Sequence, residues 1–99
     1  MTGRWAPASF ALHSNFPNPF NPSTTIRYQL AETALVRLQV YDVLGQRVRE
    51  LVGERQAAGY YQVQWDSRGD YGRPVAAGVY LYRLEAGDFA QVRKLLLLK

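Results

Sequence analysis

The chain has 99 residues, the length of one domain, and 47% of them are apolar and 20% charged, as in ordinary soluble globular proteins. It contains no cysteine and a single histidine, His13, which excludes a disulfide framework, a thiolate nucleophile and a cysteine-based zinc site. The net charge is +4, and ten of the twelve basic residues are arginines that alternate with apolar residues. This placement is more typical of a solvated sheet face than of a nucleic-acid groove. The composition also argues against an enzyme.

Apolar and polar residues alternate with a period of two along most of the chain, and this period predicts strands. The expected strands are Thr24–Leu30, Ala34–Tyr41, Gln46–Val52, Tyr60–Trp65, Val79–Glu85 and Phe89–Leu98. No stretch carries a convincing apolar stripe at helical spacing over three turns, and no stretch approaches the length of a membrane-spanning segment. Gln46–Glu54 is also compatible with a helix, but its neighbours favour a hairpin. Short strands with turn signals between them predict an all-β, antiparallel sandwich of about seven strands.

The segments between these strands carry turn chemistry. Asp42 to Gly45 and Asp66 to Gly69 each place Asp at the first and Gly at the fourth position, which favours a type I turn with the glycine free to adopt a positive φ. Gly87-Asp88 suits a tight hairpin between the last two strands.

The segment Asn15 to Pro22 contains three prolines within six residues. Proline fixes φ and lacks a backbone donor, so we expect this segment to run extended along a sheet edge, with Asx turns at Asn18 and Asn21. It is either a rigid lead-in that seats Phe16 and Phe20 on the core or a preformed recognition strip.

Three other features point only weakly to a site. Arg68-Gly69-Asp70 spells an integrin-binding tripeptide, but turn chemistry already explains its glycine and aspartate. Asp66 and Asp70 supply too few oxygens for a calcium loop. His13 and Ser14 are adjacent on an extended chain, so their side chains point in opposite directions and cannot form a nucleophile–base pair. We expect no catalytic residue, no cofactor and no metal.

The chain closes on Leu95 to Leu98, four leucines in a row. Because neighbouring side chains of a strand face opposite sides, these leucines indicate a central strand, a bulge, or a face left open for a partner.

Three segments occur here in the order of a known family: Asn15 to Pro22, then Val40 to Val48 (Val-Tyr-Asp-Val-Leu-Gly-Gln-Arg-Val), then Gly78 to Leu84 with the basic end Arg93 to Lys99. Together they resemble the C-terminal sorting domain of type IX (Por) secretion substrates, and the related immunoglobulin-like domain of the flagellar hook-capping protein. The resemblance covers Asn15 to Lys99 and implies an immunoglobulin-like fold for residues 15–99. Residues 1–14 are then expected to be a leader or linker from an upstream domain.

The resemblance implies a non-catalytic sorting signal that directs an attached cargo protein across the outer membrane. The expected partners are the type IX translocon, a cell-surface sortase and the N-terminally attached cargo, with no nucleic acid and no membrane insertion. The domain is expected in the periplasm in transit, and then at the cell surface or outside the cell. The implied sorting residues are Pro17, Asn18, Pro19, Phe20, Tyr41, Asp42, Gly45, Gln46, Gly78, Tyr80, Tyr82, Leu84, Lys94, Leu95, Leu96, Leu97, Leu98 and Lys99.

Two alternatives remain open at the level of the sequence. The first is a structural domain of the hook-capping or adhesion type that acts by self-association and forms oligomers as its concentration rises. The second is carbohydrate binding through Trp5, Trp65 or the tyrosines. Trp65 falls on the apolar face of its expected strand, so we expect it in the core.

Overall fold

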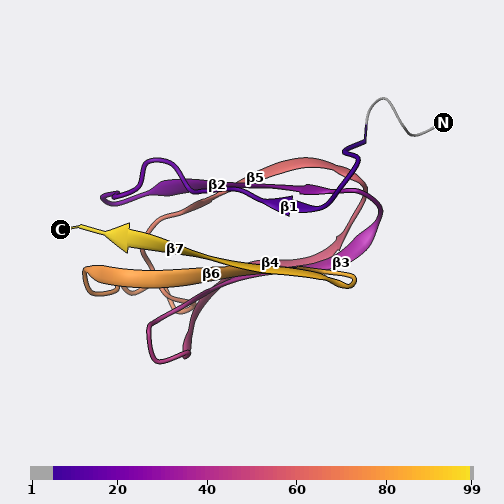
Figure 1. Ribbon diagram of the computed structural model, residues 1–99. Helices are drawn as coiled ribbons and strands as arrows, with labels where there is room; N and C mark the ends of the chain where they lie inside the picture. Colours follow the sequence, from indigo (N-terminus) through magenta and orange to yellow (C-terminus); the bar gives the residue numbers. More distant parts are fainter. Residues whose placement is uncertain (1–5, 99) are drawn as a thin grey trace.

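In the computed structural model, which describes residues 6–98, seven strands form two antiparallel sheets that pack face to face (Figure 1). One sheet has the strand order β1-β2-β5, and the other has the order β4-β3-β6-β7. The strands are β1 (Ala11–Leu12), β2 (Thr24–Leu30), β3 (Ala34–Tyr41), β4 (Arg47–Gln56), β5 (Gly59–Trp65), β6 (Gly78–Ala86) and β7 (Phe89–Leu97). The predicted all-β sandwich is confirmed. Residues 6–98 contain no helix that is long and apolar enough to cross a membrane.

The strands lie close to where the alternation placed them, and β2 and β3 have the predicted bounds. Strand β4 differs most, because it begins after Gln46 and continues past Val52 to Gln56. It pairs with β3 along its whole length, and this pairing shifts register after Leu38 and again after Val40. Both shifts lie within the predicted part of the strand. The part that the sequence missed, residues 53–56, is Gly-Glu-Arg-Gln and mostly exposed, so it carries no apolar alternation that would predict a strand.

Strand β1 is the one element that the sequence did not predict, because two residues carry no measurable period. It pairs antiparallel with β2, placing Ala11 opposite Gln29 and Leu12 opposite Tyr28. The Leu12 side chain is buried in the core. The first sheet therefore begins inside residues 1–14, the segment expected to be a leader.

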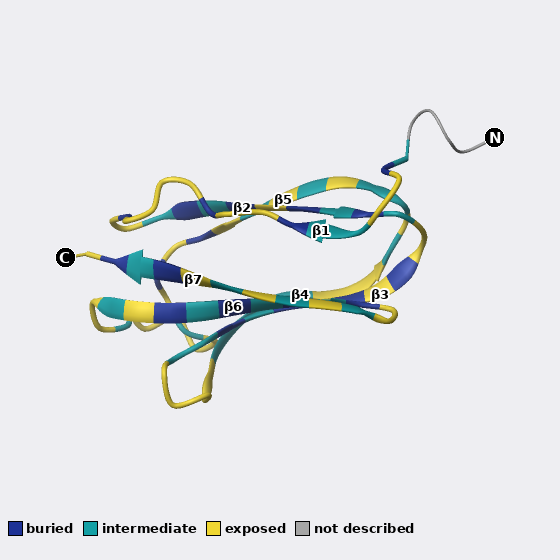
Figure 2. Ribbon diagram, viewed as in Figure 1, coloured by how far each residue is buried: buried dark blue, intermediate teal, exposed yellow. Residues whose placement is uncertain are grey.

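The core lies between the two sheets and is filled by the inward-facing residues of each strand, which alternate with exposed residues in Figure 2. Its largest fully buried side chain is Trp65, which confirms that this residue belongs to the core. The Trp65 ring lies 5.8 Å from the ring of Phe20 and 5.5 Å from that of Tyr80, edge to face with the latter. The Trp65 indole N–H donates to the Arg68 carbonyl at 2.9 Å, so its one polar group is satisfied. A buried Trp65 cannot stack on a sugar, and Trp5 lies outside the described residues.

The connections between strands divide between the two ends of the sandwich (Figure 1). The turns at residues 31–33, 57–58 and 87–88 lie at one end, beside the N-terminal side of β1. The segment before β2, the turn between β3 and β4, the long connection from β5 to β6 and the end of β7 lie at the other. All three motif segments of the sequence reach this second end, although the later half of the Gly78–Leu84 segment runs back along β6.

Candidate functional site

The proline-rich segment, residues 15–22, links the two sheets. Phe16 and Thr25 exchange backbone N–H···O hydrogen bonds of 2.9 Å, which ties the segment to β2. Phe20 forms a parallel bridge with Leu97: its N–H donates to the Leu96 carbonyl at 3.0 Å, and its carbonyl accepts from the Leu98 N–H at 2.9 Å. The segment follows the sheet edges as predicted, but it bends between these anchors instead of staying extended, because they lie in different sheets.

A buried amide fixes the start of this segment. The Asn15 Nδ2 donates to the Thr24 Oγ1 at 3.0 Å and to the Pro17 carbonyl at 3.3 Å, while the Thr24 hydroxyl donates to the same carbonyl at 2.8 Å. Asn18 was expected to fold onto its own backbone, but its Oδ1 instead accepts the Leu96 N–H of β7 at 3.0 Å. The segment and the terminal strand thus form one hydrogen-bonded unit.

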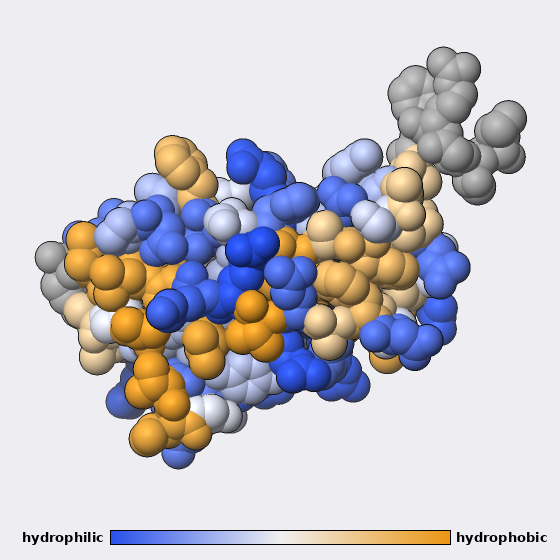
Figure 3. Space-filling model, in the orientation of Figure 1, coloured by the Kyte–Doolittle hydropathy of each residue, from blue (hydrophilic) through white to orange (hydrophobic). Residues whose placement is uncertain are grey.

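The turn between β3 and β4 is held by one carboxylate. The Asp42 Oδ1 accepts the backbone N–H groups of Leu44 at 2.9 Å and of Gln46 at 3.0 Å. Gly45 adopts a φ of +83°, the positive value expected of it, and its N–H donates to the Asp42 carbonyl at 3.0 Å. The tip projects from the sandwich with Val43 68% and Leu44 81% exposed, and hydrophobic residues gather on this projection in Figure 3.

The connection from β5 to β6 supports the base of this turn. The Asp70 N–H donates to the Val48 carbonyl at 3.0 Å, and the Asp70 carboxylate accepts the Glu50 N–H at 2.9 Å and lies 3.2 Å from the Arg47 guanidinium. The Arg68 guanidinium donates to the Gly72 carbonyl at 2.7 Å. Both charged groups of the Arg-Gly-Asp tripeptide are therefore engaged within the domain. The type I turn predicted at Asp66 to Gly69 is wrong, because the Gly69 N–H donates to the Arg73 carbonyl at 2.9 Å and Ser67, not Gly69, adopts a positive φ of 67°.

The third motif contributes mainly to the core. The side chains of Tyr80, Tyr82 and Leu84 all face inward from β6 and are buried. The Tyr80 hydroxyl donates to the Ala76 carbonyl at 2.5 Å, and the Tyr82 hydroxyl donates to the His13 carbonyl at 2.7 Å. Burial raises the pKa of Tyr80, and it raises that of Tyr82 to about 12 despite the nearby Arg93 guanidinium. These side chains stabilise the sandwich and offer no surface to a partner of the folded domain.

The four leucines divide between the two faces of β7. Leu95 and Leu97 are buried in the core, whereas Leu96 is partly exposed and Leu98 is 47% exposed on the outer side. The strand lies at a sheet edge, and its pairing with β6 runs without a bulge. The strand is therefore neither central nor bulged. It leaves one face partly open, which is the third of the interpretations of the four leucines. Lys94 is exposed, and Lys99 lies outside the described residues.

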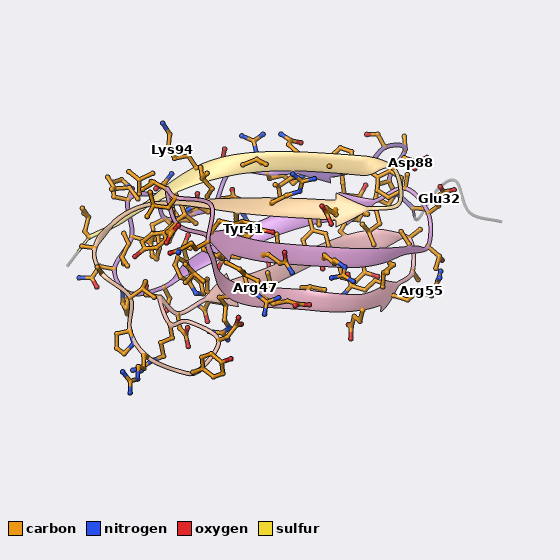
Figure 4. All side chains as sticks on the ribbon, turned by 90° about the horizontal axis from the view of Figure 1, so that it is seen from below. Glu32, Tyr41, Arg47, Arg55, Asp88 and Lys94 are labelled. Atoms are coloured by element: carbon orange, nitrogen blue, oxygen red, sulfur yellow. The ribbon has the colours of Figure 1, made fainter. Side chains whose placement is uncertain are left out.

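The exposed members of the three motifs lie at one end of the molecule. They comprise Pro17, Asn18 and Pro19 of the first segment, Gly45 and Gln46 of the turn, and Lys94 and Leu98 of the last strand. Figure 4 places Tyr41 and Arg47 toward this end, and Glu32, Arg55 and Asp88 at the opposite end. We call the surface formed by residues 17–19, the turn at residues 42–46 and the end of β7 the motif end.

The most exposed apolar side chains of the motif end, Val43 and Leu44, are absent from the residues that the resemblance singled out. A signal was present in the sequence, because two large apolar residues between Asp42 and Gly45 are unusual in a turn, where polar residues prevail. The buried anchors Asn15 and Thr24 were missed for another reason. Their roles depend on contacts that form only when the chain is folded.

The other polar side chains that the sequence singled out each contact a neighbour within residues 6–98. The His13 imidazole contacts the Gln29 side chain at 3.2 Å, and the Ser67 hydroxyl donates to the Pro22 carbonyl. The Asp66 carboxylate lies 3.1 Å from the Arg49 guanidinium. Within residues 6–98, no three His, Asp or Glu side chains are grouped in a way that would hold a metal ion.

Comparison with known proteins decides the family. The family model for the FlgD Ig-like domain matches residues 20–88, well over half of the chain. The chain belongs to the FlgD Ig-like domain family. The match covers β2 to β6 and both Asp-x-x-Gly segments, of which Asp42 to Gly45 forms the predicted turn. No curated protein sequence matches the chain.

Two solved structures share the fold of this FlgD Ig-like domain. Dimeric latent PorU from Porphyromonas gingivalis aligns with a TM-score of 0.72 at 22% identity over 88% of this chain and 9% of PorU. PorZ from the same organism, described as an essential bacterial surface component of the type-IX secretion system, aligns with a TM-score of 0.60 at 19% identity. That alignment covers 90% of this chain and 12% of PorZ. The chain therefore corresponds to a small part of each protein.

Proposed function

We propose that this FlgD Ig-like domain is a non-catalytic sorting module that directs an attached cargo protein across the outer membrane by type IX secretion. The observation that carries the proposal is the gathering of exposed parts of all three motifs at the motif end. The terminal strand and the proline-rich segment meet there through backbone hydrogen bonds. The fold shared with PorZ, a component of that secretion system, supports the same assignment.

The motif end has the physical properties of a docking surface. Val43 and Leu44 are exposed, yet the turn that carries them is held by the two hydrogen bonds to Asp42. A rigid apolar tip loses little conformational entropy when it enters a pocket of a partner. We propose the type IX translocon and a surface sortase as the partners, and the periplasm followed by the cell surface as the route.

An export assay with folded variants tests this function. Residues 10–99 would be fused to the C-terminus of a periplasmic reporter and produced in a bacterium with type IX secretion, and surface and periplasmic reporter would be quantified. We expect the fusion to reach the surface. We expect the double variant Val43→Ser, Leu44→Ser to remain in the periplasm, because it removes the apolar tip but leaves Asp42 and the core intact.

The matched control is Leu35→Ser, which removes a 52% exposed leucine. Leu35 lies opposite Arg55 in the pairing of β3 with β4, and Figure 4 places Arg55 at the end remote from the motif end. This control should be exported like the unchanged fusion. Stable, folded fusion that stays in the periplasm would overturn the proposed function, and equal export of the tip variant would remove Val43 and Leu44 from it.

A further inference from the structure

We propose that two copies of this chain associate through the free edge of β5, by antiparallel pairing of the two β5 strands into one continuous six-stranded sheet. This inference does not depend on the proposed function, because β5 contains none of the residues of the motif end. It follows from a comparison of the sheet edges. An unpaired edge strand presents backbone N–H and C=O groups that pair readily with another chain unless the protein protects them.

The edge of β7 is protected by the segment before β2. Phe20 and the Asn18 side chain bond to the outward N–H and C=O groups of Leu96 and to the N–H of Leu98. The Arg93 guanidinium donates to the Leu12 carbonyl at 2.7 Å and so joins the middle of β7 to β1. Strand β1 is itself only two residues long, which is too short to template a partner strand.

The edge of β4 is protected by three features. The connection from β5 to β6 covers its first half, where the Val48 carbonyl and the Glu50 N–H bond to Asp70. The two register shifts against β3 twist and kink the strand. Five of its ten residues are charged, and charges on an edge disfavour pairing with another chain.

Strand β5 lacks all of these protections. Its seven residues, Gly-Tyr-Tyr-Gln-Val-Gln-Trp, include no charge and no proline. It pairs with β2 without a register shift, and within residues 6–98 its backbone forms no hydrogen bond outside that pairing. A regular, uncharged edge of this length is the type that adds a strand.

The side chains of β5 also lack cover on the free side. Tyr61 and Val63 face the core but are only partly buried, whereas Ile26 and Tyr28, their partners on β2, are buried. Tyr61 stacks on Tyr28 with 5.3 Å between ring centroids. A further strand beside β5 would cover the exposed parts of Tyr61 and Val63, which gives the association an apolar component.

A second copy of β5 suits this edge because the strand is self-complementary. An antiparallel pair centred on Gln62 places Gln62 opposite its counterpart, Tyr61 opposite Val63, and Tyr60 opposite Gln64. Two glutamine amides can each donate to and accept from the other. A tyrosine opposite a valine is a favourable cross-strand pair. No charged side chains of β5 stand opposite each other in this pair, so the strand pairing itself brings no like charges together.

Sedimentation velocity of the 99-residue chain over a range of roughly 10 μM to 1 mM tests the proposal, since an interface of a single strand pair is small and weak. We expect a shift from monomer to dimer. The variant Gln62→Lys places two like charges opposite each other and should raise the dissociation constant by about fivefold. Gln62 is exposed, so the fold, checked by circular dichroism, should persist.

Two further samples make the result specific to β5. An equimolar mixture of Gln62→Lys and Gln62→Glu should associate more strongly than either variant alone, because unlike charges then face each other. Ala90→Lys adds the same charge on an exposed position of β7 and should associate like the unchanged chain. A chain that stays monomeric over the whole range, or a dimer unaffected by Gln62→Lys and not restored in the mixture, would overturn the proposal.

Discussion

Two tyrosines, one in each sheet, keep a neutral hydroxyl inside the sandwich. The Tyr28 hydroxyl donates to the Gln56 Oε1 at 2.7 Å, and the Tyr82 hydroxyl donates to the His13 carbonyl at the same distance. Burial, which disfavours the phenolate, raises the pKa of each to about 12 from the ordinary 10.0. The folded state therefore holds these protons more tightly than the unfolded state.

This difference predicts a loss of stability at alkaline pH. The contribution of the two tyrosines is fully present below pH 10.0 and should be lost as pH rises through the folded-state pKa of about 12, because the unfolded chain releases its protons first. Urea midpoints between pH 8 and pH 12 measure the effect. Tyr82→Phe should lower stability at pH 8 by about 1 kcal/mol, through its lost hydrogen bond, and flatten the alkaline slope. If stability still fell with pH just as steeply in both Tyr82→Phe and Tyr28→Phe, these two tyrosines would not be the cause of the alkaline loss of stability.

At the scale of the element, the proline-rich segment combines a core anchor with an exposed surface. Phe20 is 2% exposed and packs on Trp65, while Phe16, four residues earlier, is 70% exposed. Both phenylalanines pair through their backbones with a strand. The sequence left two possibilities open. A lead-in that seats its ring on the core describes Phe20, and a recognition strip exposed to a partner describes the part around Phe16.

Replacement of the two rings should separate these roles. Phe20→Ala removes a buried ring from the aromatic cluster and should destabilise the domain by about 3–5 kcal/mol. Phe16→Ala alters a surface position and should change the free energy of unfolding by less than about 0.5 kcal/mol. Chemical denaturation of the two variants beside the unchanged chain measures both values. Similar losses in the two variants would mean that the segment packs as a whole instead of through Phe20.

At the scale of the whole molecule, the terminal strand belongs to the fold as much as to the motif end. Leu97 lies opposite Gly78 and Leu95 opposite Tyr80 in the pairing of β7 with β6. Both leucines are buried, and Phe20 depends on the same stretch for its backbone partners. A change in this strand therefore alters both sheets, which is why substitutions at exposed positions test the proposed function better than a truncation does.

Deletion of residues 95–99 should abolish cooperative folding. The loss of two buried leucines alone corresponds to about 2–5 kcal/mol each, against a total stability of about 5–15 kcal/mol for a domain. The backbone bonds to Phe20 and β6 are lost as well. Thermal unfolding followed by circular dichroism should show no sharp transition for the truncated chain. Leu98→Ser, at an exposed position, serves as the control and should keep the transition. A truncated chain with an unchanged midpoint would refute this role.

The alternation of apolar and polar residues was sufficient to place most of the strands. In β2 and β3 every second residue is buried, so the period of two gave the bounds of both strands. The same signal ended too early in β4, because residues 53–56 are polar on both faces and are held only by their pairing with β3. It also failed in β1, which exists only because Ala11 and Leu12 find partners on β2. A local pattern of apolar and polar residues indicates whether a side chain faces the core or the solvent, but it does not indicate which strand the residue pairs with.

The features of the candidate site also fall into those that the sequence predicted and those that it did not. The sequence by itself determined the all-β class, the turn at Asp42 to Gly45 and the burial of Trp65, because backbone preference and side-chain polarity act locally. Only the tertiary structure decided that Phe20 meets Leu97, that Asn18 reaches β7, and that no strand within residues 6–98 covers the outer edge of β5. These outcomes depend on pairings between residues far apart in the chain, such as Asn18 and Leu96, whose contact energy exists only when both sheets have formed.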